Sequence, residues 1–196
     1  MTDQVFKSII EKYPDKDIRF LENSSPSGQH SLLVPPEIAV DVAYFLRDCL
    51  GFDYCSNVTG VDWINGVKKG IWKSDSNEEI DGGKSGFLEV VYHLYSVQKK
   101  VGPLILRVRT KTREDRPELP SLTPVWKSAE FQEREVFDLF GIWFGGHPDM
   151  RRLLMWEEFE GHPMRKDYIP PDDYEYEPTP HGQILERIKT KAGKTE

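Results

Sequence analysis

The sequence predicts an α+β domain with a mainly antiparallel sheet, packed helices and an extended, irregular C-terminal segment. Helix-like and strand-like patterns follow one another in the order helix, strands, helix, strands, helix up to residue 140. The strongest strand pair, residues 87–97 and 103–112, is joined by the short turn QKKVG. From Gly145 onward prolines recur too often for long regular elements, which predicts extended chain.

Composition limits the possible classes of protein. The 196 residues carry a formal net charge of -7, which disfavours binding to nucleic acid or to an anionic membrane surface. We found no run of 18 or more apolar residues and no signal-peptide pattern at the start, so we expect a soluble, cytosolic chain. Two cysteines are too few for an iron–sulfur cluster, which normally takes four thiolates.

The first half of the chain predicts two helices and three strands. A helix begins at Thr2 and is closed by Pro14, and short strands follow at 18–22 and 30–34. Pro35 and Pro36 open a second helix that Gly51 ends. We expect its buried stripe to consist of Ile38, Val42, Phe45 and Cys49. Residues 54–63 predict a further strand, in which Cys55 is a strand thiol whereas Cys49 is a core thiol.

The middle of the chain contains a polar stretch, a strand pair and a helix. Residues 65–86 are glycine-rich and predict an exposed loop. In the strand at 103–112, residues Leu104, Leu106, Val108 and Thr110 alternate with Ile105, Arg107, Arg109 and Lys111, so we expect one wet face. A helix runs from about Trp126 to Phe140. We therefore place a core domain at 1–144 and an extended docking segment at 145–196.

The last helix carries charges in the run EREVFD. Arg134 lies four residues from both Glu130 and Asp138, a spacing that allows ion pairs on a solvated face. The same helix has too many apolar residues for one narrow stripe, so two of its faces need cover. Charges between two buried faces must be paired. The candidates for such a buried lattice or interface lock are Glu133, Arg134, Glu135 and Asp138.

The C-terminal segment repeats Gly-His-Pro. His147 and His162 are each followed by a basic pair, Arg151-Arg152 and Arg165-Lys166. The histidine spacing does not specify a metal site, so hydrogen bonding at turns is the simpler interpretation. The run GGKS at 82–85 lacks the earlier glycine of a phosphate-binding loop and predicts a turn. Because the basic pairs sit on an acidic chain, we expect carboxylates of this chain or of a neighbour to meet them.

These residues resemble a known family. The run ERExxDLF at 133–140, followed by His147, Arg151 and Leu153-Leu154, is similar to the signature of the C subunit of NADH:quinone oxidoreductase. That protein is the 30 kDa-type peripheral-arm subunit of respiratory complex I. Four further stretches also resemble the family, namely VTGVDW at 58–63, VVYHLYS at 90–96, WKSAEFQ at 126–132 and EGHPMRKDY at 160–168.

The resemblance implies a non-catalytic structural subunit that braces the D subunit at the quinone site of a proton-translocating complex. FMN, iron–sulfur clusters and quinone then belong to partner subunits, with no metal or cofactor on this chain. It also implies a peripheral location on the cytoplasmic side of the bacterial cell membrane. The interface or structural residues that it implies are Glu133, Arg134, Glu135, Asp138, His147, Arg151, Arg152, His162, Arg165, Lys166 and Asp167.

Other functions stay open at this point. The same signature occurs in relatives linked to ferredoxin, hydrogenases or deazaflavin, so the sequence does not identify the electron donor. A free-standing protein-binding domain is a second possibility. A metal hydrolase that uses His147, Asp149 and His162 is a weaker third one.

Overall fold

The structure, a computed structural model, describes residues 2–24, 28–64, 86–113 and 116–169. The chain divides into two compact units, Met1–Lys166 and Asp167–Glu196, and only residues 167–169 of the second are described. The predicted loop at 65–86 therefore lies almost entirely outside the described residues. The boundary predicted between residues 144 and 145 falls inside the first unit.

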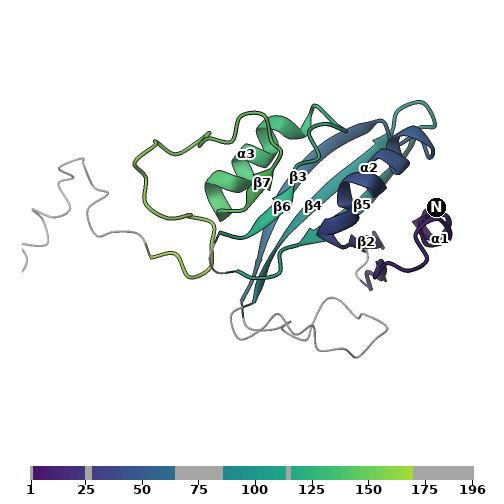
Figure 1. The fold of residues 1–196 in the computed structure, drawn as a ribbon, viewed down its shortest axis with the longest axis horizontal. Coiled ribbons are helices and arrows are strands. Elements are labelled where there is room, and N and C mark those ends of the chain that lie inside the picture. Colours follow the sequence, from purple (N-terminus) through teal and green to yellow (C-terminus); the bar gives the residue numbers. More distant parts are fainter. Residues whose placement is uncertain (1, 25–27, 65–85, 114–115, 170–196) are drawn as a thin grey trace, which may run out of the picture. The chain divides into compact units, whose positions relative to one another are not determined.

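The order of elements follows the predicted one (Figure 1). The elements of the described chain are α1 Thr2–Lys12, β1 Arg19–Leu21, β2 Ser31–Val34, the 3₁₀ turn η1 Pro36–Ile38, α2 Ala39–Asp48, β3 Tyr54–Trp63, β4 Phe87–Ser96, β5 Val101–Arg109, β6 Glu118–Pro120, α3 Ala129–Phe140 and β7 Trp143–Gly145. The short strands β6 and β7 were not predicted: β6 lies in a proline-bearing stretch, and β7 is only three residues long.

Five strands form one sheet in the order β1-β2-β5-β4-β3, and only the β2–β5 pair is parallel. The predicted mainly antiparallel α+β fold is therefore confirmed. A separate parallel pair, β6 and β7, joins the chain before α3 to the chain after it.

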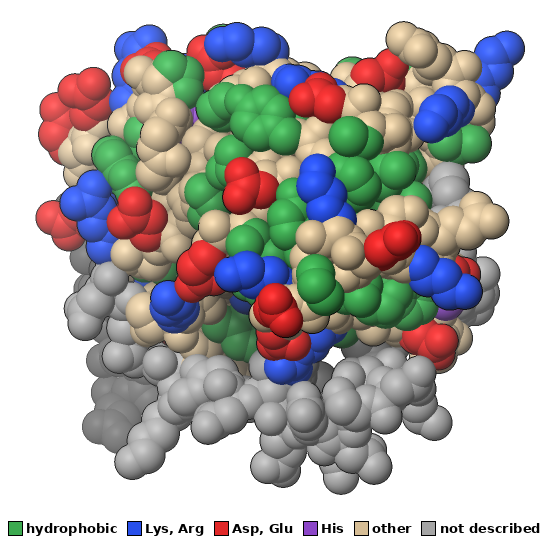
Figure 2. Space-filling model, turned by 45° about the vertical axis from the view of Figure 1, so that its right-hand side comes forward, with side chains coloured by type: hydrophobic (Ala, Val, Ile, Leu, Met, Phe, Trp, Pro, Cys, Tyr) green, Lys and Arg blue, Asp and Glu red, His purple; other side chains and the backbone are tan. Residues whose placement is uncertain are grey.

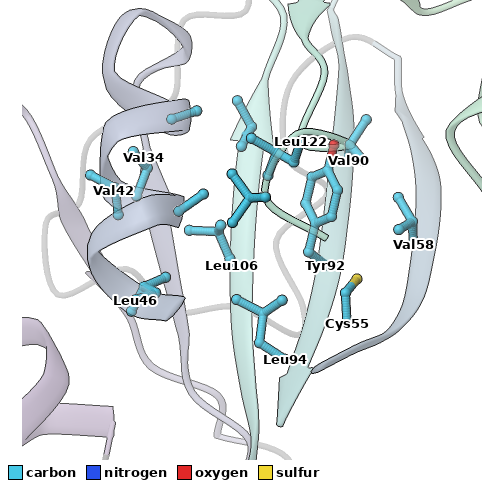
Figure 3. Close-up of a cluster of buried hydrophobic side chains, with 14 of the residues drawn as sticks. Val34, Val42, Leu46, Cys55, Val58, Val90, Tyr92, Leu94, Leu106 and Leu122 are labelled. Carbon is cyan, nitrogen blue, oxygen red and sulfur yellow. The ribbon is translucent and has the colours of Figure 1, made fainter. Parts of the chain in front are cut away.

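One face of the sheet forms the core (Figure 3). In the register, Tyr92 of β4 lies between Val58 of β3 and Leu106 of β5, and all three side chains are buried. Helix α2 packs its side chains into the same cluster, and Val136 of α3 joins it. Gly60 allows α3 to approach β3, because a Cβ there would collide with the ring of Phe140.

The buried stripe of α2 differs from the prediction. Ile38 and Val42 are buried as predicted, whereas Phe45 is half-buried and Cys49 is exposed. The other buried residues of the helix are Ala39, Ala43 and Leu46. The stripe is rotated relative to the predicted one because Ala39 and Ala43, two small residues, provide close contact with the sheet. The buried thiol is that of Cys55, not that of Cys49.

The prediction of a wet face on β5 is also wrong. Ile105 and Arg107 are buried there, because Arg107 and Arg109 both pair with the fully buried carboxylate of Glu89 at 2.6 and 3.0 Å. Arg107 also donates to the hydroxyl of Ser31 at 2.9 Å. Paired arginines keep their alkyl stems over the sheet, so a face rich in charged residues is still covered.

The surface seen in Figure 2 mixes side chains of all kinds. Hydrophobic side chains gather over the middle of this face, and single acidic or basic side chains interrupt them. The mixture is typical of protein surfaces, more than half of which is apolar, so this face alone indicates no binding site.

Candidate functional site

Helix α3 carries the predicted charged residues, and its inner face holds Glu133. The Glu133 carboxylate is fully buried and accepts hydrogen bonds from the Ser121 hydroxyl at 2.6 Å and the Leu122 amide at 2.8 Å. The Tyr92 hydroxyl donates to it at 3.1 Å. Glu133 therefore fastens α3 both to β4 and to the loop after β6.

Burial dominates the electrostatics of this carboxylate. It raises the pKa of Glu133 to about 7, and the hydrogen bonds from Ser121, Leu122 and Tyr92 oppose that rise only in part. Burial, reinforced by the nearby Glu133 charge, raises the pKa of the Cys55 thiol to about 12. Cys55 is therefore a protonated core thiol and not a nucleophile.

The outer face of α3 holds Asp138, whose carboxylate organises the chain that follows β7. Its Oδ2 accepts three successive amides, those of Leu153, Leu154 and Met155, at 3.0, 2.7 and 2.8 Å. Burial alone would raise the pKa of Asp138, but these amides and Arg152 outweigh burial and lower it. The carboxylate is therefore held ionised at the centre of a turn.

Arg152 completes this centre. Its guanidinium donates to Asp138 Oδ1 at 2.7 Å and to the Asp138 carbonyl at 3.3 Å. The same group donates to the carbonyls of Phe159 and Gly161 at 2.8 and 3.1 Å. Arg152 therefore links Asp138 of α3 to the backbone at Phe159 and Gly161. The planar guanidinium, with several donors in a fixed geometry, allows these bonds at the same time.

The last turn of α3 is capped by the chain that follows it. The Phe137 carbonyl accepts the last i→i−4 bond of the helix, so the carbonyls of residues 138–140 have no helical partner. Gly141, in the left-handed region with φ of 76°, donates its amide to Phe137 at 2.8 Å. The Met164 amide bonds the Leu139 carbonyl at 3.1 Å, and Arg165 bonds that of Phe140 at 2.7 Å.

His162 shares the remaining carbonyl with Arg152. Its Nδ1 lies 2.9 Å from the Asp138 carbonyl, which can only accept, so Nδ1 carries the proton. Burial first, and then the charges of Arg165 and Arg152, lower the pKa of His162. Positive groups at this helix end also match the negative end of the helix dipole.

The other histidine and Arg134 bind the segment further along the helix. His147 donates from Nε2 to the Glu130 carbonyl at 2.9 Å, and its Nδ1 accepts the Asp149 amide at 3.0 Å. Arg134 donates to the carbonyls of Arg151 and Arg152 at 3.2 and 3.1 Å. Residues 146–166, here named the docked segment, therefore run along α3 as Figure 1 shows in yellow-green.

The end of the docked segment is fixed to the sheet. Lys166 donates its amide to Asp62 Oδ2 at 2.8 Å, while Arg113 binds the same carboxylate with two bonds of 2.6 and 2.8 Å. The Lys166 ammonium lies 5.9 Å from the centre of the Trp63 ring. No local spacing connects Asp62, Arg113 and Lys166, which is why sequence reasoning missed the first two.

The structure thus brings together most of the predicted site residues, but through different contacts. Arg134 does not pair with Glu130 or Asp138 as predicted, because it reaches backbone carbonyls and, at 3.7 Å, Asp149. Glu135 is exposed and lies outside the lattice. Arg151 has 66% of its side chain exposed and pairs at the surface with Asp149 at 2.9 Å. Asp167 begins the second unit.

The first basic pair meets carboxylates of this chain as expected, since Arg151 pairs with Asp149 and Arg152 with Asp138. Arg152 and Arg165 also bond to backbone carbonyls, which was not expected. Both histidines bond to carbonyls of α3, which corresponds to the simpler interpretation of the Gly-His-Pro repeat.

Within residues 2–24, 28–64, 86–113 and 116–169, no three His, Cys, Asp or Glu side chains are grouped closely enough to hold a metal ion. None of the helices in these ranges has the length and hydrophobicity needed to cross a bilayer.

The fold and the site define an α+β protein in which the docked segment is hydrogen-bonded along the charged helix α3. Residues 32–174 match the family described as the 30 Kd subunit of the respiratory-chain NADH dehydrogenase. The chain belongs to this family, and the resemblance found in the sequence is confirmed.

Relatives with curated names agree with the family. A Rhizobium meliloti protein, named as C subunit number 2 of NADH-quinone oxidoreductase, is 40% identical over 144 residues, which cover 72% of this chain and 66% of that protein. The C subunit of the Moorella thermoacetica enzyme is 34% identical over 168 residues, or 85% and 94% of the two chains. A Bacteroides thetaiotaomicron protein, named as a combined C/D subunit, is 41% identical over 145 residues, 25% of its length. The chain thus spans just under two thirds of the Rhizobium protein.

Two solved structures share the fold. A trypsin-resistant fragment (1-134) of Nqo5 has a TM-score of 0.51 and 28% identity, over 74% of this chain and 98% of the fragment. A chain of the membrane-bound sulfane sulfur reductase, an archaeal respiratory membrane complex, has a TM-score of 0.59 over 99% of this chain and 92% of that one. At 21% identity the second similarity concerns the fold alone.

Proposed function

We propose that this chain is a non-catalytic structural subunit of the peripheral arm of a proton-translocating NADH:quinone oxidoreductase, where it braces the D subunit. In this proposal FMN, iron–sulfur clusters and quinone are held by partner subunits. The chain lies on the cytoplasmic side of the bacterial membrane, as a peripheral part of the complex.

The observation that supports the proposal is that the signature residues form hydrogen bonds within the chain itself. Glu133, Asp138, Arg152 and His162 are bonded to the chain's own backbone and hydroxyl groups, and these contacts hold the docked segment on α3. Catalytic side chains must keep polar atoms available to a substrate, whereas these are used for internal bonds. A rigid element that displays an extended segment is what a bracing subunit requires.

The choice of the D subunit as partner is supported by the fused relative. A single Bacteroides thetaiotaomicron protein carries the combined C/D name, and this chain matches a quarter of it. Two subunits whose sequences occur in one polypeptide must be able to lie next to each other. The other relatives, which are named as C subunits of NADH-quinone oxidoreductase, support the class of complex.

Co-purification tests the proposal. The full-length chain with an affinity tag is expressed together with the D subunit of the same organism, and the complex is isolated by affinity and size exclusion. We expect a complex with one copy of each protein, and lower hydrogen–deuterium exchange in residues 146–166 when the partner is present. If the D subunit is not retained and exchange is unchanged, the free-standing binding domain becomes the better hypothesis.

The same isolation from the native membrane identifies the class of electron donor. Subunits that bind FMN and NADH are expected among the co-purifying proteins. If a hydrogenase, a ferredoxin-binding protein or a deazaflavin-binding protein appears in their place, the chain belongs to the corresponding relative of the complex.

A further inference from the structure

The carboxylate of Glu133 lies in the core without a cation. Its side chain is fully buried, and it forms no ion pair with any described residue. A buried charge is normally paired, because an unpaired one loses its hydration without compensation. The hydrogen-bonding neighbours of Glu133 therefore decide which charge state the folded chain accepts.

The titratable groups that face this carboxylate are Tyr92 from β4 and Cys55 from β3. Burial raises the pKa of both, that of Cys55 to about 12, so both stay protonated and neither supplies a charge. The loop after β6 contributes hydroxyls and an amide from residues 121–123, and Figure 3 shows the oxygen of Tyr92 next to Leu122 of this loop. Burial and three hydrogen bonds set the pKa of Glu133, and no charged side chain contributes.

Ser121 and Thr123 form a chain of two hydroxyls that ends on Glu133, here named the hydroxyl chain. When the carboxylate is ionised, the Ser121 hydroxyl donates to Oε2 at 2.6 Å. The Ser121 oxygen accepts the Thr123 amide at 3.2 Å and, because its own hydrogen is already used, the Thr123 hydroxyl as well. Ser121 then makes three hydrogen bonds, which is the full capacity of a hydroxyl group.

A proton on Glu133 reverses the hydroxyl chain. Oε1 must remain an acceptor, since the Leu122 amide donates to it at 2.8 Å, so the proton binds to Oε2. The carboxyl then donates to Ser121, whose hydroxyl turns to the oxygen of Thr123. Ser121 still accepts the Thr123 amide and again makes three hydrogen bonds. The two charge states therefore differ in the direction of the chain.

The hydroxyl chain is also connected to the residue before the docked segment. The Ser121 amide donates to the Gly145 carbonyl at 2.9 Å, directly after the β6–β7 pair. Of the parts of the chain that bond to Glu133, Ser121 and Leu122 lie outside helix and strand, whereas Tyr92 belongs to the central sheet. Water can therefore reach an ionised Glu133 at the least cost if this loop opens.

We propose that Glu133 is the proton-binding centre of a switch, in which a proton taken from water reverses the hydroxyl chain and closes the loop, whereas loss of that proton frees the loop from Gly145. The chain then holds the start of the docked segment in a pH-dependent way. This inference does not rest on the proposed function, because all of its contacts lie within the chain.

The titration of Glu133 tests the reversal. In the full-length chain with ¹³C-labelled glutamate, NMR follows the carboxyl signal that is absent from Glu133→Gln, and we expect a midpoint at about pH 7. Thr123→Val removes the acceptor of the Ser121 hydrogen in the protonated state but only one of two donors to Ser121 in the ionised state. A buried donor without an acceptor costs more than one weakened bond, so the midpoint should fall by about one pH unit.

Thr123→Ser keeps the hydroxyl and should titrate like the wild type. A midpoint that stays the same or rises in Thr123→Val would mean that the hydroxyls keep one direction, and the reversal would be overturned.

Hydrogen–deuterium exchange tests the opening of the loop. Corrected for the intrinsic pH dependence of exchange, the protection of the Ser121 and Leu122 amides should fall at least tenfold between about pH 6 and pH 8. It should stay constant in Glu133→Gln, whose amide nitrogen can donate to Ser121 as the protonated carboxyl does. Near pH 8 both amides should exchange at least tenfold faster than that of Leu106 in β5. Equal rates at the three amides would mean that the protein opens as a whole, which overturns the local switch.

Glu135→Gln is the matched control, because Glu135 lies on the same helix and is exposed. It removes a carboxylate from α3 without touching the hydroxyl chain. We expect an unchanged midpoint for Glu133 and unchanged protection of the loop. If Glu135→Gln shifts either quantity as much as the substitutions at Glu133 and Thr123 do, the overall charge of α3 controls the loop, and the proposal is overturned.

Discussion

Glu133 is a residue whose ionisation is strongly changed by the fold. Its carboxylate is surrounded by β4, α3 and the loop after β6, and the raised pKa near 7 means that ionising it in place is unfavourable. The unfolded chain has the ordinary carboxyl pKa of 4.5. The folded state therefore binds a proton more tightly than the unfolded state between these two values.

The first prediction concerns the variant Glu133→Gln. Because the folded-state pKa is raised, the stabilising effect of the protonated carboxyl is complete below pH 4.5 and is lost as the pH rises through 7. Relative to the variant, the free energy of unfolding of the wild type should fall by roughly 2–3 kcal/mol between about pH 5 and pH 8. Urea unfolding at several pH values measures this difference.

The wild type must be compared with the variant at each pH, because the titration of His162 changes the free energy of unfolding in the opposite direction to that of Glu133. The lowered pKa of His162 contributes stability that is lost as the pH falls, and both proteins share this contribution. A difference that stays constant from about pH 5 to pH 8 would mean that Glu133 does not titrate in that range.

The two neighbouring arginines provide the second prediction. Arg152 has 16% of its side chain exposed and bonds to Asp138 and two carbonyls, whereas Arg151 is 66% exposed and pairs only at the surface. Arg152→Ala leaves a buried carboxylate without its cation, so it should lower the free energy of unfolding by about 3–5 kcal/mol. Arg151→Ala should cost less than about 1 kcal/mol. Equal losses in urea unfolding would refute the different roles assigned here.

At the scale of elements, the sequence predicts α3 well but not its partners. The helix was expected at about 126–140 and observed at Ala129–Phe140, because apolar spacing and Gly141 are local signals. The ion pairs of Arg134 with Glu130 and Asp138 that helical spacing allows do not form, because Arg134 donates to the carbonyls of Arg151 and Arg152 instead. The bonds that form instead join side chains of α3 to backbone groups about fifteen or more residues away, which no local pattern encodes.

The third prediction tests this long-range capping through Asp138→Asn. A neutral amide accepts hydrogen bonds more weakly than a carboxylate, and its NH₂ group repels the donors that surround it. The amides of Leu153, Leu154 and Met155 should exchange with deuterium at least tenfold faster, about 1.4 kcal/mol of lost protection. Asp149→Asn is the matched control, since Asp149 lies in the same segment and pairs with Arg151 at the surface.

Unchanged exchange in Asp138→Asn, or an equal increase in Asp149→Asn, would contradict the role of the Asp138 carboxylate as organiser of the turn. Neither substitution should alter exchange in β4 or β5, because the buried residues of the core cluster lie outside the docked segment, of which Met150 packs against them. Those strands therefore serve as an internal reference for the measurement.

At the scale of the whole molecule, the described part of the chain is held together in two ways. The sheet and helices pack through a periodic apolar pattern, and the fold class could therefore be predicted from the sequence. The docked segment is held by arginines and histidines that bond to carbonyls, with prolines between them and no period. The buried residues of the core cluster end at Phe144, whereas the compact unit continues to Lys166.

The last prediction links this second mode of packing to assembly. Arg134 is buried and donates to the carbonyls of Arg151 and Arg152 in the docked segment. Arg134→Ala leaves these carbonyls unbonded and loosens the segment, whereas the sheet and its core remain. If the proposed function holds, at least tenfold less assembled complex is expected on native gels of membranes, with normal NADH:quinone turnover per assembled complex. The conservative variant Arg134→Lys should restore part of the assembly, since a lysine reaches one carbonyl but lacks the fork of arginine. Full assembly combined with reduced turnover would instead assign Arg134 a role in the reaction and remove the structural interpretation of this residue.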